Sequence, residues 1–210
     1  MTRLLLLVMI PACLTEVELL DEEELELAVP EANLGVIVDL APPTTYFRDV
    51  PAQHTRSADA RFEYTASEPA TFRCKLDGAA YAPCDPAGTS YYWLPVGSHT
   101  FCVYATDASG NADASPICYA WTIDQTPPQT TITYAPPALT ESRTATFTLA
   151  ASEPATFRCS LDGNPVSCAG ATVTLSNLAF GTHMFVAVAT DRAGNRDTTP
   201  AYHSWRIKIL

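Results

Sequence analysis

Alternating apolar and polar residues recur along the chain from residue 40 onward, and this pattern predicts short β-strands. In Thr71–Leu76, for example, Phe72 and Cys74 share one face while Arg73 takes the other. The same alternation predicts strands at Ala60–Ala66, His99–Thr106 and Tyr119–Asp124. Segments rich in Gly, Asn, Asp and Pro separate these runs, and no helical periodicity occurs beyond residue 40. Short strands divided by turns favour a β-sandwich.

The chain repeats itself with a period of 84 to 85 residues. SEPATFRCKLDG at Ser67–Gly78 returns as SEPATFRCSLDG at Ser152–Gly163, and TDASGNAD at Thr106–Asp113 returns as TDRAGNRD at Thr190–Asp197. Such a period indicates two copies of one small domain. The predicted fold class is therefore all-β, with two tandem β-sandwich domains at residues 39–123 and 124–210.

Six of the seven cysteines fall into pairs when the two copies are aligned. Each copy has one pair about ten residues apart. A further pair occurs only in the first copy, where the second has Val186 and Tyr202, as expected if those two cysteines bond to each other. The predicted disulfide cysteines are Cys74, Cys84, Cys102, Cys118, Cys159 and Cys168. Oxidised cysteines indicate an extracytoplasmic protein.

The seventh cysteine, Cys13, follows a short secretory leader. One arginine precedes the apolar run Leu4–Ile10, and the small residue Ala12 stands directly before the cysteine. This arrangement resembles the lipobox of bacterial lipoproteins, although Pro11 departs from that pattern. The resemblance implies a signal peptide at residues 1–12, a lipidated Cys13 and attachment to the membrane through the lipid. The alternative is an ordinary signal peptide cut nearby, which would leave Cys13 as a thiol.

An acidic segment follows at residues 13–38. Between Glu16 and Glu31 lie eight of the 23 carboxylates, and no Lys or Arg occurs from Leu4 to Phe47. An amphipathic helix on the membrane surface is the alternative, but such helices carry Lys and Arg toward anionic lipid. A solvated tether is the simpler interpretation. The second copy has six acidic and six basic residues, so nothing indicates a nucleic-acid partner.

The repeated pattern resembles tandem bacterial immunoglobulin-like repeats, which are also similar to fibronectin type III modules. The residues that carry the likeness are Ser-Glu-x-Ala-x-Phe-x-Cys-x-Leu-Asp-Gly, the later Gly-x-His-x-Phe-x-Val-x-Ala-x-Asp run ending in Gly-Asn, and a final Trp. It covers Asp39–Leu210 and implies an extracellular or cell-surface location. It implies little about activity, because this fold hosts many functions.

Catalysis finds no support in the sequence. Motifs for serine hydrolysis, zinc proteolysis and phosphate binding are missing from the chain. His99 and His183 occupy equivalent inward positions, which favours packing over catalysis. We therefore predict that the protein is not an enzyme.

Calcium is a candidate cofactor, because oxygen-rich loops recur in both copies. The candidate ligands are Asp107, Asn111, Asp113, Asp124, Asp191, Asn195 and Asp197. The alternative is that these residues serve the turns themselves, since Asp, Asn and Gly favour turns without any metal.

The clearest local difference between the copies is aromatic. Tyr91, Tyr92 and Trp93 align with Leu175, Ser176 and Asn177. Tyr91 replaces a core leucine, whereas Tyr92 and Trp93 stand where the other copy tolerates polar side chains. We expect at least one of them to be exposed and to bind a glycan or a surface protein, with Tyr81 nearby. The alternative is that they cover a loop or pack at the joint between domains.

Taken together, these features predict a non-catalytic, lipid-anchored protein of the cell envelope that acts as an adhesion, binding or spacer module. One alternative is a carbohydrate-binding module that uses the aromatic residues of the first domain. A second is a purely structural stalk.

Overall fold

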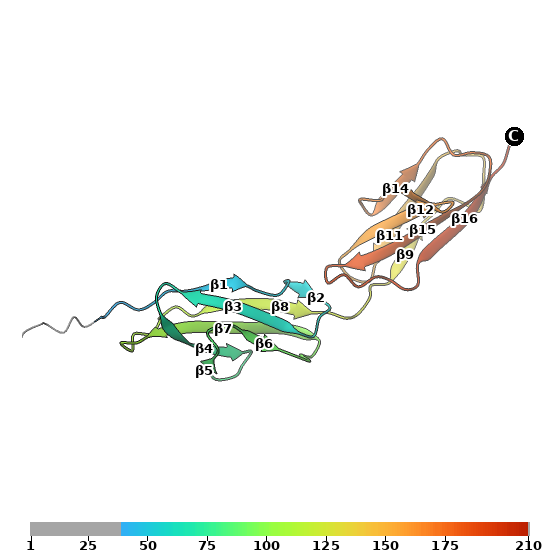
Figure 1. Cartoon of the computed structure of the whole chain (residues 1–210). Coiled ribbons are helices and arrows are strands. Elements are labelled where there is room, and N and C mark those ends of the chain that lie inside the picture. Colours follow the sequence, from blue (N-terminus) through green and yellow to red (C-terminus); the bar gives the residue numbers. More distant parts are fainter. Residues whose placement is uncertain (1–38, 210) are drawn as a thin grey trace, which may run out of the picture. The chain divides into compact units, whose positions relative to one another are not determined.

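The computed structural model describes residues 39–209. The predicted signal peptide, Cys13 and the acidic tether lie outside the described residues, as does Leu210. The described part of the chain consists of strands β1 to β16 without a helix (Figure 1). Within residues 39–209, nothing forms a helix long and apolar enough to span a membrane.

The first β-sandwich contains eight strands in two sheets. One sheet has the order β1-β3-β6, and the other has the order β2-β8-β7-β4-β5. The strands are β1 (Thr45–Asp49), β2 (His54–Thr55), β3 (Ala60–Ala66), β4 (Ala70–Leu76), β5 (Ala82–Cys84), β6 (Thr89–Tyr91), β7 (Gly97–Asp107) and β8 (Ile117–Ile123).

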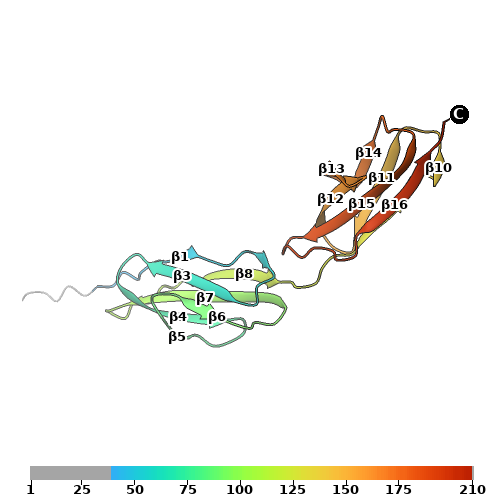
Figure 2. The same ribbon diagram turned by 45° about the vertical axis from the view of Figure 1, so that its right-hand side comes forward.

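The second β-sandwich repeats this arrangement. Its sheets have the orders β9-β11-β14 and β10-β16-β15-β12-β13, and the strands β12, β15 and β16 can be followed side by side in Figure 2. The strands are β9 (Thr130–Tyr134), β10 (Leu139–Thr140), β11 (Ala145–Ala151), β12 (Ala155–Leu161), β13 (Asn164–Val166), β14 (Thr172–Leu175), β15 (Gly181–Asp191) and β16 (Ala201–Ile207).

The connections follow the immunoglobulin type, with strands exchanged between two facing sheets. In each sandwich the pairing is antiparallel except for one short strand, since β2 pairs parallel with β8 and β10 pairs parallel with β16. The long strand β7 lies between β4 and β8, and β15 lies between β12 and β16. The longer strands alternate between buried and exposed residues because one face of each sheet covers the core.

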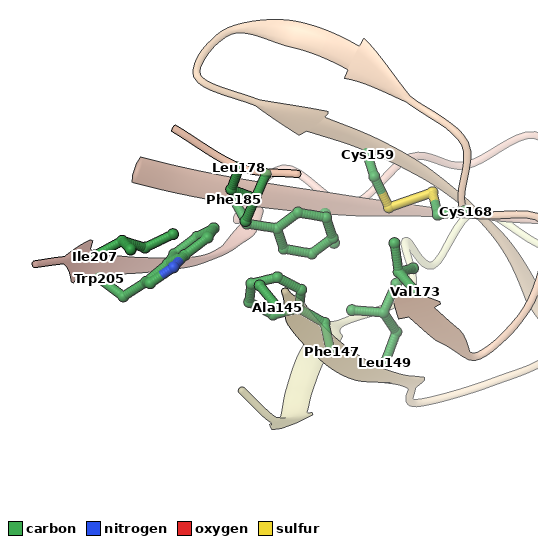
Figure 3. Packing of buried hydrophobic residues seen from close by; sticks show 11 residues of the cluster. Ala145, Phe147, Leu149, Cys159, Cys168, Val173, Leu178, Phe185, Trp205 and Ile207 are labelled. Carbon is green, nitrogen blue, oxygen red and sulfur yellow. A yellow bond between two sulfur atoms is a disulfide. The ribbon is translucent and has the colours of Figure 1, made fainter. Parts of the chain in front are cut away.

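A stacked phenylalanine pair joins the two sheets at the centre of each core. Phe62 and Phe101 stack with ring centroids 4.2 Å apart in the first sandwich, and Phe147 and Phe185 stack at 4.1 Å in the second. Figure 3 shows the second pair between Trp205 on one side and the disulfide of Cys159 and Cys168 on the other. These rings are fully buried, and large aromatic side chains of this kind add much apolar area to a small core.

Three disulfides are present among the described residues, paired as the alignment of the copies predicts. Cys74–Cys84 and Cys159–Cys168 occupy equivalent places beside the two cores. Cys102 and Cys118 are direct neighbours across β7 and β8. Their neighbours Phe101 and Val103 are buried in the core, so this third bond lies on the outer face of the sheet.

Candidate functional site

The loop between β6 and β7 exposes a run of apolar side chains on the first sandwich. Trp93 is 89% exposed and Tyr92 is 65% exposed, and Val96 is also exposed. Tyr91 at the end of β6 and Leu94 within the loop pack against the core instead. The loop is therefore fixed at two apolar points while its aromatic tip faces solvent.

Trp93 adopts a left-handed backbone conformation with φ of 59°. This region costs about 1–2 kcal/mol for most L-residues, and bulky side chains rarely occupy it. A tryptophan that is both exposed and strained in this way contributes neither packing nor backbone stability to the fold.

The second sandwich provides the direct comparison. Asn177 occupies the equivalent position with the same φ of 59°, and asparagine tolerates this conformation well. The turn geometry is thus a property of the repeated fold. The tryptophan is a property of the first copy alone.

Two hydrogen bonds hold the backbone around Trp93. The Trp93 N–H donates to Oδ1 of Asp59 at 3.2 Å, and the Leu94 N–H donates to the Ala58 carbonyl at 2.9 Å. The second bond recurs in the other sandwich between Leu178 and Arg143, where Thr144 replaces Asp59. Asp59 is thus a support for Trp93 that the sequence pattern did not reveal, because it lies 34 residues away in the chain.

The remaining predicted aromatic residue, Tyr81, lies on a different surface. Its ring contacts Tyr104 of β7 edge-on at 4.9 Å, with the Nζ atom of Lys75 4.9 Å from the Tyr81 ring centroid. These three residues cover the outer face of the five-stranded sheet. In the second sandwich the equivalents of Tyr104 and Lys75 are Val188 and Ser160, which line an open groove.

His99 and His183 are buried at the starts of β7 and β15, as their inward positions predict. The Nδ1 atom of His99 lies 3.0 Å from Asp77 Oδ2, and its Nε2 atom lies 2.9 Å from the Pro95 carbonyl oxygen. The ring of His99 also lies 5.3 Å from the ring of Trp121. Asp77 is a partner that sequence reasoning did not identify.

Within the repeated TDxxGNxD motif, the first aspartate and the asparagine bond to each other. Asp107 accepts from the backbone N–H and the side-chain amide of Asn111, both at 2.8 Å. Asp191 and Asn195 make the same two bonds at 2.8 Å, and Asn195 also donates to the Asp124 carbonyl. These bonds close the turn between β7 and β8, and between β15 and β16.

The last aspartate of the motif ties the first strand of each sandwich to the long central strand. Asp197 Oδ2 accepts from the Thr130 N–H at 2.7 Å, and its Oδ1 accepts from the N–H and hydroxyl of Thr199. Burial alone would raise the pKa of Asp197, but these hydrogen bonds outweigh it and lower the pKa to about 2. Asp113 has the corresponding bonds to Thr45 and Ser115, and a lowered pKa.

Of the predicted calcium ligands, the structure brings Asp124 and Asp191 together with Glu153. One carboxylate oxygen from each lies within 4.8 Å of the other two. Burial and then the charges of Asp124 and Asp191 raise the pKa of Glu153. Three converging carboxylates offer the oxygen ligands that Ca²⁺ prefers. The sequence did not single out Glu153, although it lies in the repeated SEPATFRC segment.

No family model matches the chain, and neither does any curated protein. Among solved structures, the chain is similar to the fibronectin type III-like modules of CbhA from Clostridium thermocellum, at 14% identity, covering 79% of this chain and 94% of that one with a TM-score of 0.47. It is also similar to the titin I-band fragment I67–I69, at 14% identity, 80% and 66% coverage and a TM-score of 0.44.

A third similar structure comes from a bacterial ice-binding adhesin, at 13% identity, 80% and 65% coverage and a TM-score of 0.39. All three likenesses concern fold alone. The chain carries two tandem sandwiches of the immunoglobulin or fibronectin type III kind, held by disulfides as in extracellular modules.

Proposed function

We propose that this chain is a non-catalytic binding module of a bacterial cell envelope, and that the first sandwich binds a glycan through the loop bearing Tyr92 and Trp93. The observation that carries the proposal concerns Trp93. Its side chain is 89% exposed and its backbone is left-handed, at a position where the second sandwich has Asn177. A fold that tolerates asparagine there gains nothing in stability from tryptophan. The aromatic ring is therefore retained for a contact outside the domain.

The chemistry of the loop favours an uncharged sugar. An exposed indole offers a flat apolar face on which a pyranose ring can stack, and Tyr92 adds a second aromatic side chain beside it. The charged group that contacts the Trp93 backbone is the carboxylate of Asp59, which repels anionic polysaccharides. The first sandwich, residues 39–123, has nine acidic and five basic residues, so its own net charge acts in the same direction.

A binding assay against cellulose, chitin and their soluble hexasaccharides tests the proposal. Trp93→Ala is expected to abolish binding, and Tyr92→Ala is expected to weaken it. Tyr202→Ala is the matched control, because Tyr202 is an exposed aromatic residue of the second sandwich. If no glycan binds, or if Trp93→Ala binds as well as the wild type, the glycan assignment is wrong, and a surface-protein ligand or a purely structural stalk takes its place.

We further propose that lipid on Cys13 attaches the protein to the membrane surface, with the acidic segment as its tether. What supports this is the leader sequence, with an apolar run and a small residue before the cysteine. Metabolic labelling with palmitate and mass analysis of the mature N-terminus test it. Cys13→Ser is expected to remove the label, and an unlabelled wild-type protein would refute the anchor.

A further inference from the structure

The hydrogen bonds of His99 require a proton on each ring nitrogen. Its Nδ1 faces a carboxylate oxygen of Asp77, and its Nε2 faces the carbonyl oxygen of Pro95. Neither oxygen carries a proton to donate, so both ring nitrogens must act as donors. A neutral imidazole has one N–H, and only the imidazolium has two. The geometry is therefore that of a charged histidine at a buried position.

The surroundings of His99 support this charge. Asp77 is ionised: burial would raise its pKa, but hydrogen bonds from His99 and Thr100 lower it. Burial alone would lower the pKa of His99, but the bonds to Pro95 and Asp77 and the charge of Asp77 raise it above its ordinary value of 6.5. The ring of Trp121 lies beside the His99 ring, tilted by 35°. Tyr91 also interacts electrostatically with Asp77, and burial, followed by Tyr64 and Asp77, raises the pKa of Tyr91 above 10.0.

One of the two bonds reaches into the loop that carries Trp93. Pro95 lies two residues after Trp93, and its carbonyl is held by the Nε2 atom of His99. The other backbone bonds of this loop come from Asp59 and Ala58. Of these three attachments, the one at Pro95 depends on the protonation state of a side chain.

We propose that His99 is a positioning residue that holds the Trp93 loop in its binding geometry while the ring is protonated, and that binding by this loop weakens as the ring loses its proton. This inference rests on the proposed glycan-binding function. The neutral ring keeps its proton on Nδ1, because the Asp77 carboxylate is the stronger acceptor. The lone pair of Nε2 then faces the Pro95 carbonyl, and that bond is lost.

The second sandwich contains the same histidine arrangement, but its loop has Asn177 in place of Trp93. His183 lies 2.7 Å from Asp162 Oδ2 and 2.9 Å from the Ala179 carbonyl oxygen, with Trp205 beside its ring. The arrangement therefore belongs to the repeated fold. In the first copy it is coupled to the exposed aromatic loop, and the second copy serves as an internal control.

Asp77→Asn separates the charge of His99 from its position. The asparagine keeps an oxygen for the Thr100 N–H and presents an amide N–H to Nδ1. A neutral ring can then accept at Nδ1 and donate from Nε2 to Pro95. In this variant the loop is expected to stay attached whether or not the ring is charged.

The experiment uses the full oxidised chain labelled with 5-fluorotryptophan, which gives signals for its three tryptophans, Trp93, Trp121 and Trp205. The ¹⁹F signal of Trp93 and the C–H signal of the His99 ring are followed from about pH 6 to about pH 9. We expect both to change with one midpoint in the wild type, and the Trp93 signal to stay constant in Asp77→Asn. Asp162→Asn is the matched control and should leave the Trp93 profile unchanged.

Affinity for cellohexaose and chitohexaose is measured over the same range. We expect it to fall about fivefold as His99 deprotonates in the wild type, which corresponds to about 1 kcal/mol, and to stay constant in Asp77→Asn. The inference is overturned if the Trp93 signal does not change as His99 titrates, or if the Trp93 signal of Asp77→Asn varies with pH as in the wild type. The ¹⁹F measurement needs no ligand, so a failure of glycan binding alone is seen separately and refutes the proposed function instead.

Discussion

Asp113 holds Thr45, at the beginning of the first strand, from 68 residues further along the chain. Its Oδ2 atom accepts from the Thr45 N–H at 2.9 Å and from the Thr45 hydroxyl at 2.8 Å, and the same hydroxyl accepts from the Ala105 N–H at 3.0 Å. This buried carboxylate therefore links β1 to β7, which lie in different sheets. Asp197 and Thr130 repeat the arrangement in the second sandwich.

Removal of either carboxylate should destabilise the domain that contains it. Asp113→Ala and Asp197→Ala leave buried donors without acceptors, and we expect each to lower the free energy of unfolding of its own domain by about 3 kcal/mol. Urea unfolding of the full chain measures this. Asp49→Ala, which removes an exposed aspartate of β1, is the control and should change stability by less than about 0.5 kcal/mol. Equal effects of the buried and exposed substitutions would contradict this role.

The same carboxylates should make the domains sensitive to acid. The pKa of Asp197 is about 2 in the folded protein, below its ordinary value of 3.8. Its stabilising effect is therefore complete above about pH 4 and is lost as the pH falls toward about 2. We expect the difference in unfolding free energy between wild type and Asp197→Asn to shrink over this window. A difference that does not vary with pH would mean that the carboxylate is not preferentially ionised in the fold.

The fold could be predicted from the sequence because each position of the domain occurs twice, and the residues of the two copies could be compared. Phe72 and Phe157, and likewise His99 and His183, could be placed on the inward face because both copies show the same alternation. The polar partners were not predictable in this way. Asp59, Asp77 and Glu153 act through contacts with residues distant in the chain, and an alternating pattern says nothing about which turns meet at one end of a sandwich.

The exposure of Tyr92 and Trp93 could be inferred because the other copy has Ser176 and Asn177. The backbone conformation of Trp93 could not be inferred, since a left-handed residue inside a five-residue connection does not alter the hydrophobic pattern. The short strands β2 and β10 are among those that the pattern did not predict, for a similar reason. Two residues that pair at a sheet edge are too few to show alternation.

Trp93→Asn should stabilise the first domain while it removes binding. Asparagine relieves the left-handed strain at no loss of packing, so we expect a gain of about 1 kcal/mol and a melting temperature higher by about 4–8 °C. Asn177→Trp is the reciprocal variant and should destabilise the second domain by a similar amount. Calorimetry of both variants measures the two effects. If Trp93→Asn is less stable than the wild type, the indole contributes to the fold and the argument for its external role fails.

Calcium should stabilise the second domain through Asp124, Glu153 and Asp191. A cation would relieve the mutual repulsion of these carboxylates, and a ligand that binds only the folded state raises the melting temperature. We expect a rise with millimolar CaCl₂ that chelator reverses and that Glu153→Gln reduces. Magnesium chloride at the same ionic strength is the control. Identical melting temperatures with calcium and with chelator would exclude a site here.

Reduction of the disulfides should lower the melting temperature of the first domain more than that of the second, because Cys102–Cys118 has no counterpart in the second copy. This bond closes a loop with a sequence separation of 16 residues, worth about 3 kcal/mol in the chain-entropy model. The double variant Cys102→Val with Cys118→Tyr installs the residues that the second copy uses, Val186 and Tyr202. Under oxidising conditions we expect the first domain of this variant to melt at a lower temperature than in the wild type. Reduction should then lower its melting temperature only as much as it lowers that of the second domain. Calorimetry with and without reductant, with the two transitions assigned by the Asp113→Ala and Asp197→Ala variants, measures this. Equal losses in both domains of the wild-type chain would show that the additional bond does not stabilise the first sandwich.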